Sequence, residues 1–414
     1  MYFLNEVNLF VLTNQYVSSD PRINSGGGLA QVVTNVSEKL PPDKYRVFVL
    51  TLASQDVVKY KPKPNVTVIG LKPHKNHGEK RGVYYGICPT REGWNALDLG
   101  FTAMSYMEEN YSKEMEGGKI WGNDWFTACA MMRLYEEHRM LGVYSWHMSK
   151  NRPDYNDPRL NWEREIADHI KNNGSWGHAV SETQKKIVRA AYDLPREKVT
   201  VIRNGVDVKI FRPYQPDSYL PVLEKHGIKK PFIHWSGRTA IEKRADQVIK
   251  SFPYVLDEYP DEHLVLLGLK DESGIESLYR ECNSLTPKVK DRVRIILDNI
   301  SDEERAKIYA ASDVGVFPSD PKIAPEAFGM VSTESQSCGV PVVVNKDTGL
   351  IETTIPGLTG LPVDGSCLKE LADAIVECIS KKEEWGKNAR KLMEDFFSWD
   401  NIVPEYDRLF SKLN

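Results

Sequence analysis

Residues 318–344 read PSDPKIAPEAFGMVSTESQSCGVPVVV. The stretch contains two glutamates, Glu326 and Glu334, with seven residues between them. A short helix is expected over 332–337. The run 342–344 that follows is apolar on both faces, as in a parallel strand that helices cover on both sides. This order of helix and strand predicts part of a doubly wound α/β sheet.

The two glutamates are candidate ligand contacts. A carboxylate at Glu334, on the predicted helix, can accept hydrogen bonds from two hydroxyls of a ribose. Glu326 can accept sugar hydroxyls or balance a developing positive charge, and Phe328-Gly329 lets the backbone pass close to a ligand. The alternative is a pair of unrelated helix-terminal acids, because two glutamates at a fixed spacing are common. The residues around the two glutamates are therefore needed to choose between a ligand site and two unrelated acids.

Short apolar runs alternate with amphipathic stretches in two series along the chain. The first series predicts strands at 7–13, 45–51, 66–71, 119–121, 141–146, 176–180 and 199–202, with a helix at 28–40. The second predicts strands at 232–235, 264–267, 293–297, 314–317 and 342–344, with helices at 244–258, 275–282, 302–311 and 368–380. Two such series predict two Rossmann-like sheets, and prolines in 211–216 indicate the boundary region.

Composition limits the class of protein. The chain has 414 residues, 41% of them hydrophobic and 27% charged, as in a soluble globular protein of two or three domains. The net charge of −4 argues against broad nucleic-acid binding. No apolar run is long enough to span a bilayer, and an early acid, Glu6, is atypical of a signal peptide. The six dispersed cysteines predict reduced thiols and a cytoplasmic location.

Two further motifs could bind anions. A glycine triplet at 26–28 lies between a predicted strand and helix, where backbone N–H groups can approach a phosphate; the alternative is a tight turn. Arg238 and Lys243 follow the strand 232–235 and suit a diphosphate, with Arg as a fork and Lys as a point charge. The alternative there is a solvated basic turn that pairs with Glu242.

His147 ends the apolar run 141–146, where it could donate to a ligand hydroxyl; a structural histidine is equally compatible with this pattern. Asn123-Asp124-Trp125 occupies a similar strand end. The sequence has no HExxH, no Cys/His metal cluster and no Asp-x-Asp pair, so no metal ligands are assigned. A Walker loop and a GxSxG elbow are also absent.

Together these motifs resemble the retaining glycosyltransferases of the GT-B fold, in family 4 and the glycogen/starch-synthase group ("glycosyl transferases group 1"). The resemblance is carried by 318–344, by Gly237-Arg238 with Lys243, by the NGVD segment within 201–213, by 349–360 and by Phe397-Ser-Trp399. It is strong over 199–364 and patchy before that. It implies an acceptor-side domain at 1–208, a nucleotide-sugar-binding domain at 209–395 and a closing helix at 396–414 that packs back on the first domain.

The resemblance also implies residue roles. Arg238 and Lys243 would bind the donor diphosphate and stabilise the leaving group, and Glu334 would bind the ribose. Glu326 would hold the transferred sugar, and His147 would contact it. The remaining donor-binding positions implied are Gly27, Gly28, Ala327, Phe328, Gly329, Met330, Asn299 and Ile300.

The implied activity is metal-independent, retaining transfer of a sugar from a nucleotide-diphosphate sugar, with UDP or GDP, to a carbohydrate or lipid-linked acceptor. No permanently bound cofactor and no nucleic acid are expected; a monomer or homodimer and peripheral membrane contact are both compatible. The alternatives are a glycogen/starch-synthase-like glucosyltransferase, a nucleotide-sugar 2-epimerase, a phosphorylase with lysine-bound pyridoxal phosphate and an inactive nucleotide-sugar-binding scaffold.

Some positions depart from the family pattern. Ser25 stands where the synthases have a lysine, and Arg244 stands where glycine is common. Thr348 replaces the first glycine of a usual glycine pair. The usual Gly-x-Gly after residue 267 is reduced to its first glycine, Gly268. These changes weaken a polymer-synthase assignment more than they weaken sugar transfer. In contrast, Asn123-Asp-Trp125 and the segment 350–355 favour the synthases.

Overall fold

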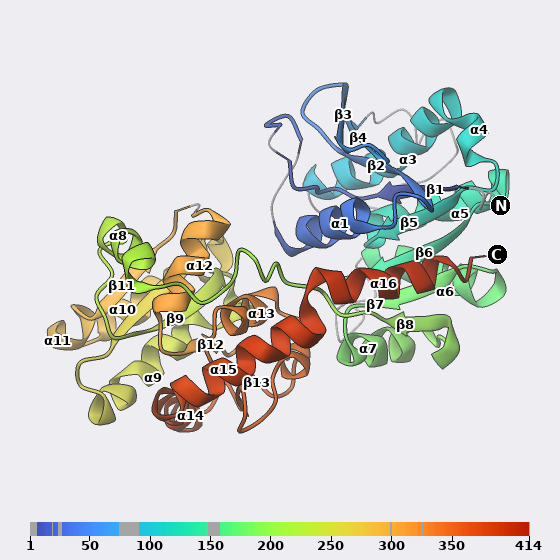
Figure 1. The fold of residues 1–414 in the computed structure, drawn as a ribbon. Helices are drawn as coiled ribbons and strands as arrows, with labels where there is room; N and C mark the ends of the chain where they lie inside the picture. Colours follow the sequence, from blue (N-terminus) through green and yellow to red (C-terminus); the bar gives the residue numbers. More distant parts are fainter. Residues whose placement is uncertain are drawn as a thin grey trace. The chain divides into compact units, whose positions relative to one another are not determined.

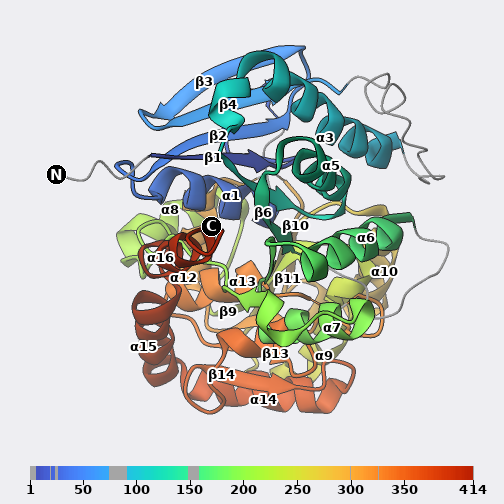
Figure 2. The ribbon, with the colours of Figure 1, turned by 90° about the vertical axis from the view of Figure 1, so that its right-hand side faces the viewer.

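The structure is a computed structural model that describes residues 6–18, 20–23, 27–73, 91–147, 158–298, 300–324 and 326–413 (Figure 1). Its internal contacts divide the chain into two compact units. The first comprises Met1–Arg203 with Ile402–Asn414, and the second comprises Asn204–Asn401. Each unit contains one sheet with helices on both sides (Figure 2).

The first unit contains an eight-stranded sheet in the order β3-β4-β2-β1-β5-β6-β7-β8. Its strands are β1 Val7–Leu12, β2 Tyr45–Leu52, β3 Val57–Lys63, β4 Val66–Leu71, β5 Lys119–Asn123, β6 Leu141–Trp146, β7 Trp176–Ala179 and β8 Val199–Val201. Its helices are α1 Gly27–Lys39, α3 Arg91–Asn110, α4 Ser112–Met115, α5 Ala128–His138, α6 Pro158–Asn172 and α7 Glu182–Tyr192, with short turns η1 Trp125–Thr127 and η2 Arg196–Lys198.

All neighbouring strands of this sheet are parallel except β3 and β4, which are antiparallel. The sequence predicted no strand at β3. Its residues VVKYKPK leave every second side chain largely in solvent, and an internal proline is compatible only with an edge position. Strand β3 therefore adds one antiparallel edge strand to the predicted doubly wound sheet.

The last residues of the chain belong to the first unit. Helix α16 spans Trp399–Phe410, and its second half packs on the first sheet. The ring of Tyr406 lies 5.3 Å from that of Trp121 between centroids, and Tyr45 donates a hydrogen bond to Asp407 at 2.7 Å. Burial of these aromatic rings stabilises the packing of α16 on the first sheet.

The second unit contains a six-stranded, entirely parallel sheet in the order β11-β10-β9-β12-β13-β14. Its strands are β9 Phe232–Arg238, β10 His263–Leu269, β11 Val293–Ile296, β12 Gly315–Phe317, β13 Val342–Asn345 and β14 Gly360–Val363. Its helices are α8 Pro216–His226, α9 Ala245–Glu258, α10 Glu272–Ser284, α11 Pro287–Lys290, α12 Asp302–Ala311, α13 Met330–Ser337, α14 Leu368–Ser380 and α15 Lys382–Leu392; shorter turns are η3 Ile241–Lys243, η4 Gly349–Thr353 and η5 Met393–Phe397.

The predicted doubly wound fold is confirmed in this unit. Val342, Val343 and Val344 of β13 are fully buried, as expected for a strand with helices on both faces. Strand β9 lies between β10 and β12, and these strands are parallel. The chain segments that leave β9 and β12 therefore start at the same end of the sheet, where its strands have their carboxyl ends. Ligands of open α/β sheets bind at this end of the sheet, beyond the carboxyl ends of the strands.

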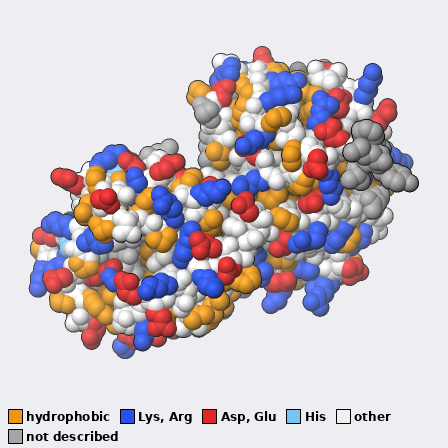
Figure 3. Space-filling model, in the orientation of Figure 1, with side chains coloured by type: hydrophobic (Ala, Val, Ile, Leu, Met, Phe, Trp, Pro, Cys, Tyr) orange, Lys and Arg blue, Asp and Glu red, His pale blue; other side chains and the backbone are white. Residues whose placement is uncertain are grey.

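The surface carries mixed charge. On the face drawn in Figure 3, Lys and Arg side chains are interspersed with Asp and Glu side chains, in keeping with the net charge of −4. Across the described residues, no helix is both long enough and apolar enough to cross a bilayer.

Candidate functional site

The segment that leaves β9 carries the predicted phosphate-binding cations. Arg238 is the last residue of β9, and its guanidinium donates to Asp271 at 2.6 Å and to Glu242 at 3.2 Å. The predicted alternative, pairing with Glu242, is thus present. The Arg238 side chain nevertheless remains 51% exposed, so its donors are accessible to a ligand.

Lys243 and Glu326 form an ion pair although they are 83 residues apart in the sequence. Lys243 ends the turn η3 after β9, and Glu326 lies in the loop after β12. Both side chains are about four-fifths buried, and Ser319 also donates to the Glu326 carboxylate at 3.4 Å. The structure therefore brings a cation suited to a diphosphate against a carboxylate suited to sugar hydroxyls.

Two glycines determine the path of the Glu326 loop. Gly329 has a φ of 88°, in the left-handed region, where it precedes helix α13. Gly349 donates its N–H to the carbonyl of Glu326 at 2.8 Å, and a Cβ on Gly349 would lie 2.0 Å from the carbonyl oxygen of Ala327. Such a contact is sterically excluded. Only glycine at 349 allows the Glu326 loop to approach so closely.

The sequence resemblance implies that Glu326 holds a transferred sugar, so we expect Gly349→Ala to displace this loop and to reduce turnover about 10-fold to 100-fold. The matched control is Gly357→Ala. Gly357 has a φ of 70°, so alanine strains the backbone there, but its Cβ would meet open space and push on no neighbouring segment. Turnover and thermal unfolding of both variants would be measured. Equal activity of the two variants would contradict the role of the close approach at Gly349.

Glu334 lies on α13 and is 5% exposed. One carboxylate oxygen, Oε1, accepts a hydrogen bond from Arg305 of α12 at 3.1 Å, while Oε2 is buried and has no hydrogen-bond partner among the described residues. Burial raises the pKa of Glu334 to about 7, which Arg305 partly opposes. An unpartnered buried carboxylate oxygen is costly unless a ligand completes it, so Oε2 is suited to accept from a ribose hydroxyl.

The sequence analysis did not identify Arg305. It lies within a predicted helix among other charged residues, and no spacing distinguishes it from its neighbours. Its guanidinium also pairs with Asp302 at 2.9 Å. Burial beside Glu334 is the only signal of its importance, and that signal requires the tertiary structure.

We expect Glu334→Gln to weaken nucleoside-diphosphate binding about 10-fold to 100-fold, as for loss of a hydrogen bond to a charged group. The raised pKa adds a pH dependence. As the predicted ribose ligand, Glu334 would accept ribose hydroxyls in its ionised form, so wild-type affinity should fall as the pH is lowered from about 8 to about 6, where the carboxylate takes up a proton.

Isothermal titration calorimetry across this pH range would measure both effects. The Glu334→Gln variant also serves as the control for the pH effect, because it retains any pH dependence that comes from the phosphates of the ligand. The same pKa shift affects folding stability in the opposite direction to ligand affinity. With a folded pKa above the ordinary value, Glu334 disfavours the folded state increasingly as the pH rises from about 4.5 to about 7. Identical pH profiles of wild type and variant would contradict this account.

In the first unit, His147 follows β6. The side-chain amide of Asn123 donates to the carbonyl of Leu12 at 3.2 Å, so its oxygen accepts the Nε2 proton of His147 at 2.9 Å. Burial, with a smaller effect from His178, lowers the pKa of His147 to about 3. The ring is therefore neutral, and Nδ1 is its acceptor atom.

Asp124 joins the ends of β5 and β6. Its φ is 63°, which is uncommon for a residue with a side chain, and its carboxylate accepts the backbone N–H of His147 at 3.0 Å. Its own N–H donates to the carbonyl of Ser145 at 3.0 Å. Strained backbone that neighbouring bonds hold in place is typical of ligand sites, so Asp124 is a candidate that the sequence left undecided.

His178 is a buried histidine that the sequence analysis did not single out. Its Nδ1 accepts from Ser145 at 2.7 Å, and its Nε2 donates to the carbonyl of Ile202 at 2.9 Å. Burial lowers its pKa to about 4. Both nitrogens are occupied within the protein, which indicates a structural role.

The other predicted donor-binding residues have varied positions. Gly27 has a φ of 79° and, with Gly28, begins helix α1. Ala327 and Phe328 are buried beside Glu326, Met330 is the first residue of α13, and Ile300 lies between β11 and α12. Asn299 lies outside the described residues.

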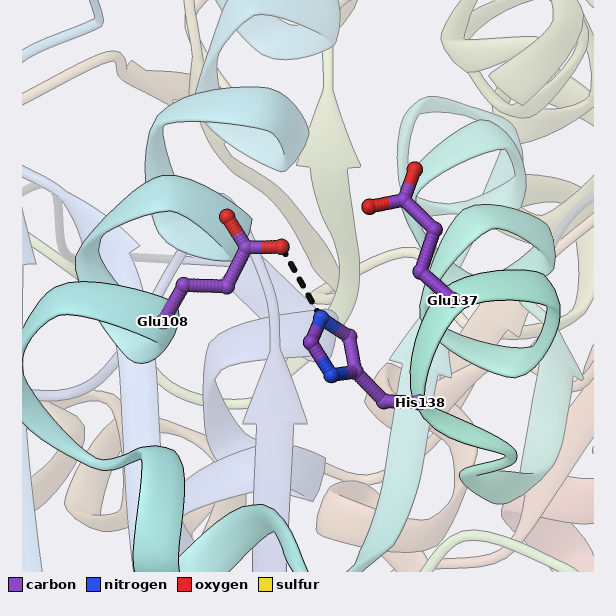
Figure 4. A group of neighbouring side chains, drawn as sticks. All are labelled: Glu108, Glu137 and His138. Carbon is purple, nitrogen blue, oxygen red and sulfur yellow. Dashed lines mark hydrogen bonds and ion pairs between the residues drawn. The ribbon is translucent and has the colours of Figure 1, made fainter.

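One other group among the described residues has metal-ligand chemistry. Glu108 of α3 faces Glu137 and His138 at the end of α5, and their ligand atoms all lie within 4.8 Å of one another (Figure 4). His138 Nε2 lies 2.9 Å from Glu108. Glu137 and His138 are exposed and Glu108 is half-buried, and a surface hydrogen bond between His138 and Glu108 accounts for the proximity of these two side chains.

Comparison with known proteins finds a family match over part of the chain. Residues 223–392 match the family model described as "Glycosyl transferases group 1". A protein of Corynebacterium glutamicum, described as a GDP-mannose-dependent monoacylated alpha-(1-6)-phosphatidylinositol monomannoside mannosyltransferase, is 30% identical over 205 residues, which are 48% of this chain and 52% of that protein. The chain spans 52% to 60% of the length of the first three curated relatives that it matches.

Solved structures match the whole chain. The sucrose-phosphate synthase of Thermosynechococcus elongatus superposes with a TM-score of 0.76 at 20% identity and covers 99% of both chains. Anabaena HepE in complex with UDP and glucose superposes with a TM-score of 0.73 at 19% identity, covering 98% of this chain and all of the other. These likenesses show that the chain has the GT-B fold.

Proposed function

We propose that the protein is a retaining glycosyltransferase, because residues 223–392 match the family model "Glycosyl transferases group 1" and the chain has the GT-B fold. It transfers a sugar from a nucleotide-diphosphate sugar to a carbohydrate or lipid-linked acceptor. The first unit serves the acceptor and the second binds the donor. The protein acts as a monomer or homodimer in the cytoplasm, with peripheral contact to a membrane where the acceptor is lipid-linked.

The observation that carries this proposal is the Lys243–Glu326 pair, with Arg238 on the same segment after β9. As the glycosidic bond to the donor breaks, negative charge grows on the diphosphate oxygens. Arg238 and Lys243 lie where they can stabilise that charge, and fixed cations do so without reorganisation during the reaction. A diphosphate would compete with Glu326 for Lys243, which leaves the carboxylate available to the sugar.

Glu334 supports the same donor. Its unpartnered oxygen fits a ribose hydroxyl, whereas a phosphate would be repelled by the carboxylate. The neutral ring of His147 can accept from a sugar hydroxyl through Nδ1. We propose that the diphosphate itself takes the proton of the acceptor on the face from which it departs. This route retains the anomeric configuration and requires neither a conventional base nor a metal.

The test is a panel of nucleotide sugars that includes UDP-glucose and GDP-mannose. Saturation-transfer NMR would identify which one binds, and release of nucleoside diphosphate would then be followed with glycan and glycolipid acceptors. We expect acceptor-dependent release that is unchanged by a chelator. Isomerised donor without an acceptor would instead identify an epimerase, and binding without release over hours would identify a scaffold. Loss of turnover with the chelator would contradict metal independence.

A further inference from the structure

Arg244 has a backbone conformation that is disfavoured for its side chain. Its φ and ψ are 53° and 40°, in the left-handed region, and it joins η3 to helix α9. Only three other non-glycine residues of the described chain have a positive φ. A glycine would adopt this conformation without strain, so the presence of arginine requires a compensating interaction of the side chain.

The side chain of Arg244 bridges two carboxylates. Its Nε donates to Asp246 at 3.0 Å and its Nη2 to the other oxygen of Asp246 at 3.2 Å, while its Nη1 donates to Asp320 at 2.7 Å. All three side chains are less than one-fifth exposed. Partial burial and bidentate geometry make such a bridge stronger than an ordinary surface pair.

The bridge joins the two segments that carry the proposed catalytic pair. Arg244 directly follows Lys243, and Asp320 belongs to the loop after β12 that continues to Glu326. A second bond reinforces the connection, since the N–H of Asp320 donates to the carbonyl of Glu242 at 2.7 Å. Loops at strand ends are otherwise the mobile parts of an α/β domain.

We propose that Arg244 is a positioning residue that holds the Lys243 turn against the Glu326 loop through Asp320. This inference rests on the proposed function, because Lys243 and Glu326 are the groups that it positions. The strained backbone places the guanidinium between the two loops, and the ion pairs keep it there. Arg244 does not itself need to touch the donor.

The decisive variant is Arg244→Gly, because it relieves the left-handed backbone and removes only the bridge. We expect only a modest loss of thermal stability, because the relieved backbone strain partly offsets the lost ion pairs, while kcat falls about 10-fold to 100-fold from misplacement of the catalytic pair. Asp320→Asn should produce a similar loss. The double variant should lose little more than either single variant, because both changes break the same contact.

The matched control is Arg139→Gly. Arg139 also has a left-handed backbone, with φ 58°, but it lies after α5 in the first unit, with its side chain over the ring of Tyr135. Its removal should leave kcat unchanged. Wild-type kcat in Arg244→Gly, fully additive losses in the double variant, or a loss that tracks a lowered melting temperature would overturn the positioning role. Absence of transfer by the wild-type enzyme would instead overturn the proposed function.

Discussion

Replacing Arg238 by alanine should lower kcat/KM for the nucleotide-sugar donor by about 10²-fold to 10³-fold, the loss typical of one preorganised contact to a developing charge. The guanidinium lies at the carboxyl end of β9, is half exposed and offers a fork of donors to the diphosphate. The folded state should hardly change. The ion pairs of Arg238 with Asp271 and Glu242 are exposed contacts, and each contributes about 0–1 kcal/mol to folding stability.

The matched control for this prediction is Lys369→Ala. Lys369 belongs to α14 of the same unit, is 82% exposed and pairs with Asp373, so its removal deletes an equal charge on an element that carries none of the predicted site residues. Steady-state kinetics and thermal unfolding of both variants would separate a catalytic loss from a structural one. If Arg238→Ala retained wild-type kcat/KM, the diphosphate site would have to lie elsewhere.

Glu326→Gln should reduce kcat by a comparable factor, about 10²-fold to 10³-fold, while donor affinity changes much less. Glutamine preserves the shape of the side chain but removes the negative charge that can balance positive charge on the transferred sugar. Lys243 then loses its counter-ion in the free enzyme and is left to the diphosphate. Donor binding should therefore persist or tighten while turnover collapses, a pattern that unfolding cannot produce.

For this variant, calorimetric donor binding would be compared with single-turnover transfer. Asp373→Asn is the control, since it neutralises a carboxylate in an exposed ion pair of α14. Parallel losses of binding and turnover in Glu326→Gln would indicate that the glutamate serves binding alone. An unimpaired rate would remove Glu326 from the mechanism.

Much of the local structure could be predicted from the pattern of residues. Each predicted strand is present, and the helices expected at 302–311 and 368–380 have the observed bounds. The sequence did not predict strand β14, because Gly360 and Pro362 are atypical of strands. Gly360 is nevertheless required there, since a Cβ would lie 2.0 Å from the carbonyl oxygen of Val342.

The amino-acid sequence by itself determined the alternation of strands and helices and the positions of Arg238, Lys243, Glu326 and Glu334 along the chain, because periodicity and motif spacing are local properties. Only the tertiary structure decided that Lys243 meets Glu326, that Arg305 pairs with Glu334, and that Arg244 adopts a glycine-like backbone to reach Asp320. These features depend on which distant segments pack together and on how deeply they exclude water. Burial and long-range charge, unlike periodicity, exist only once the chain has folded.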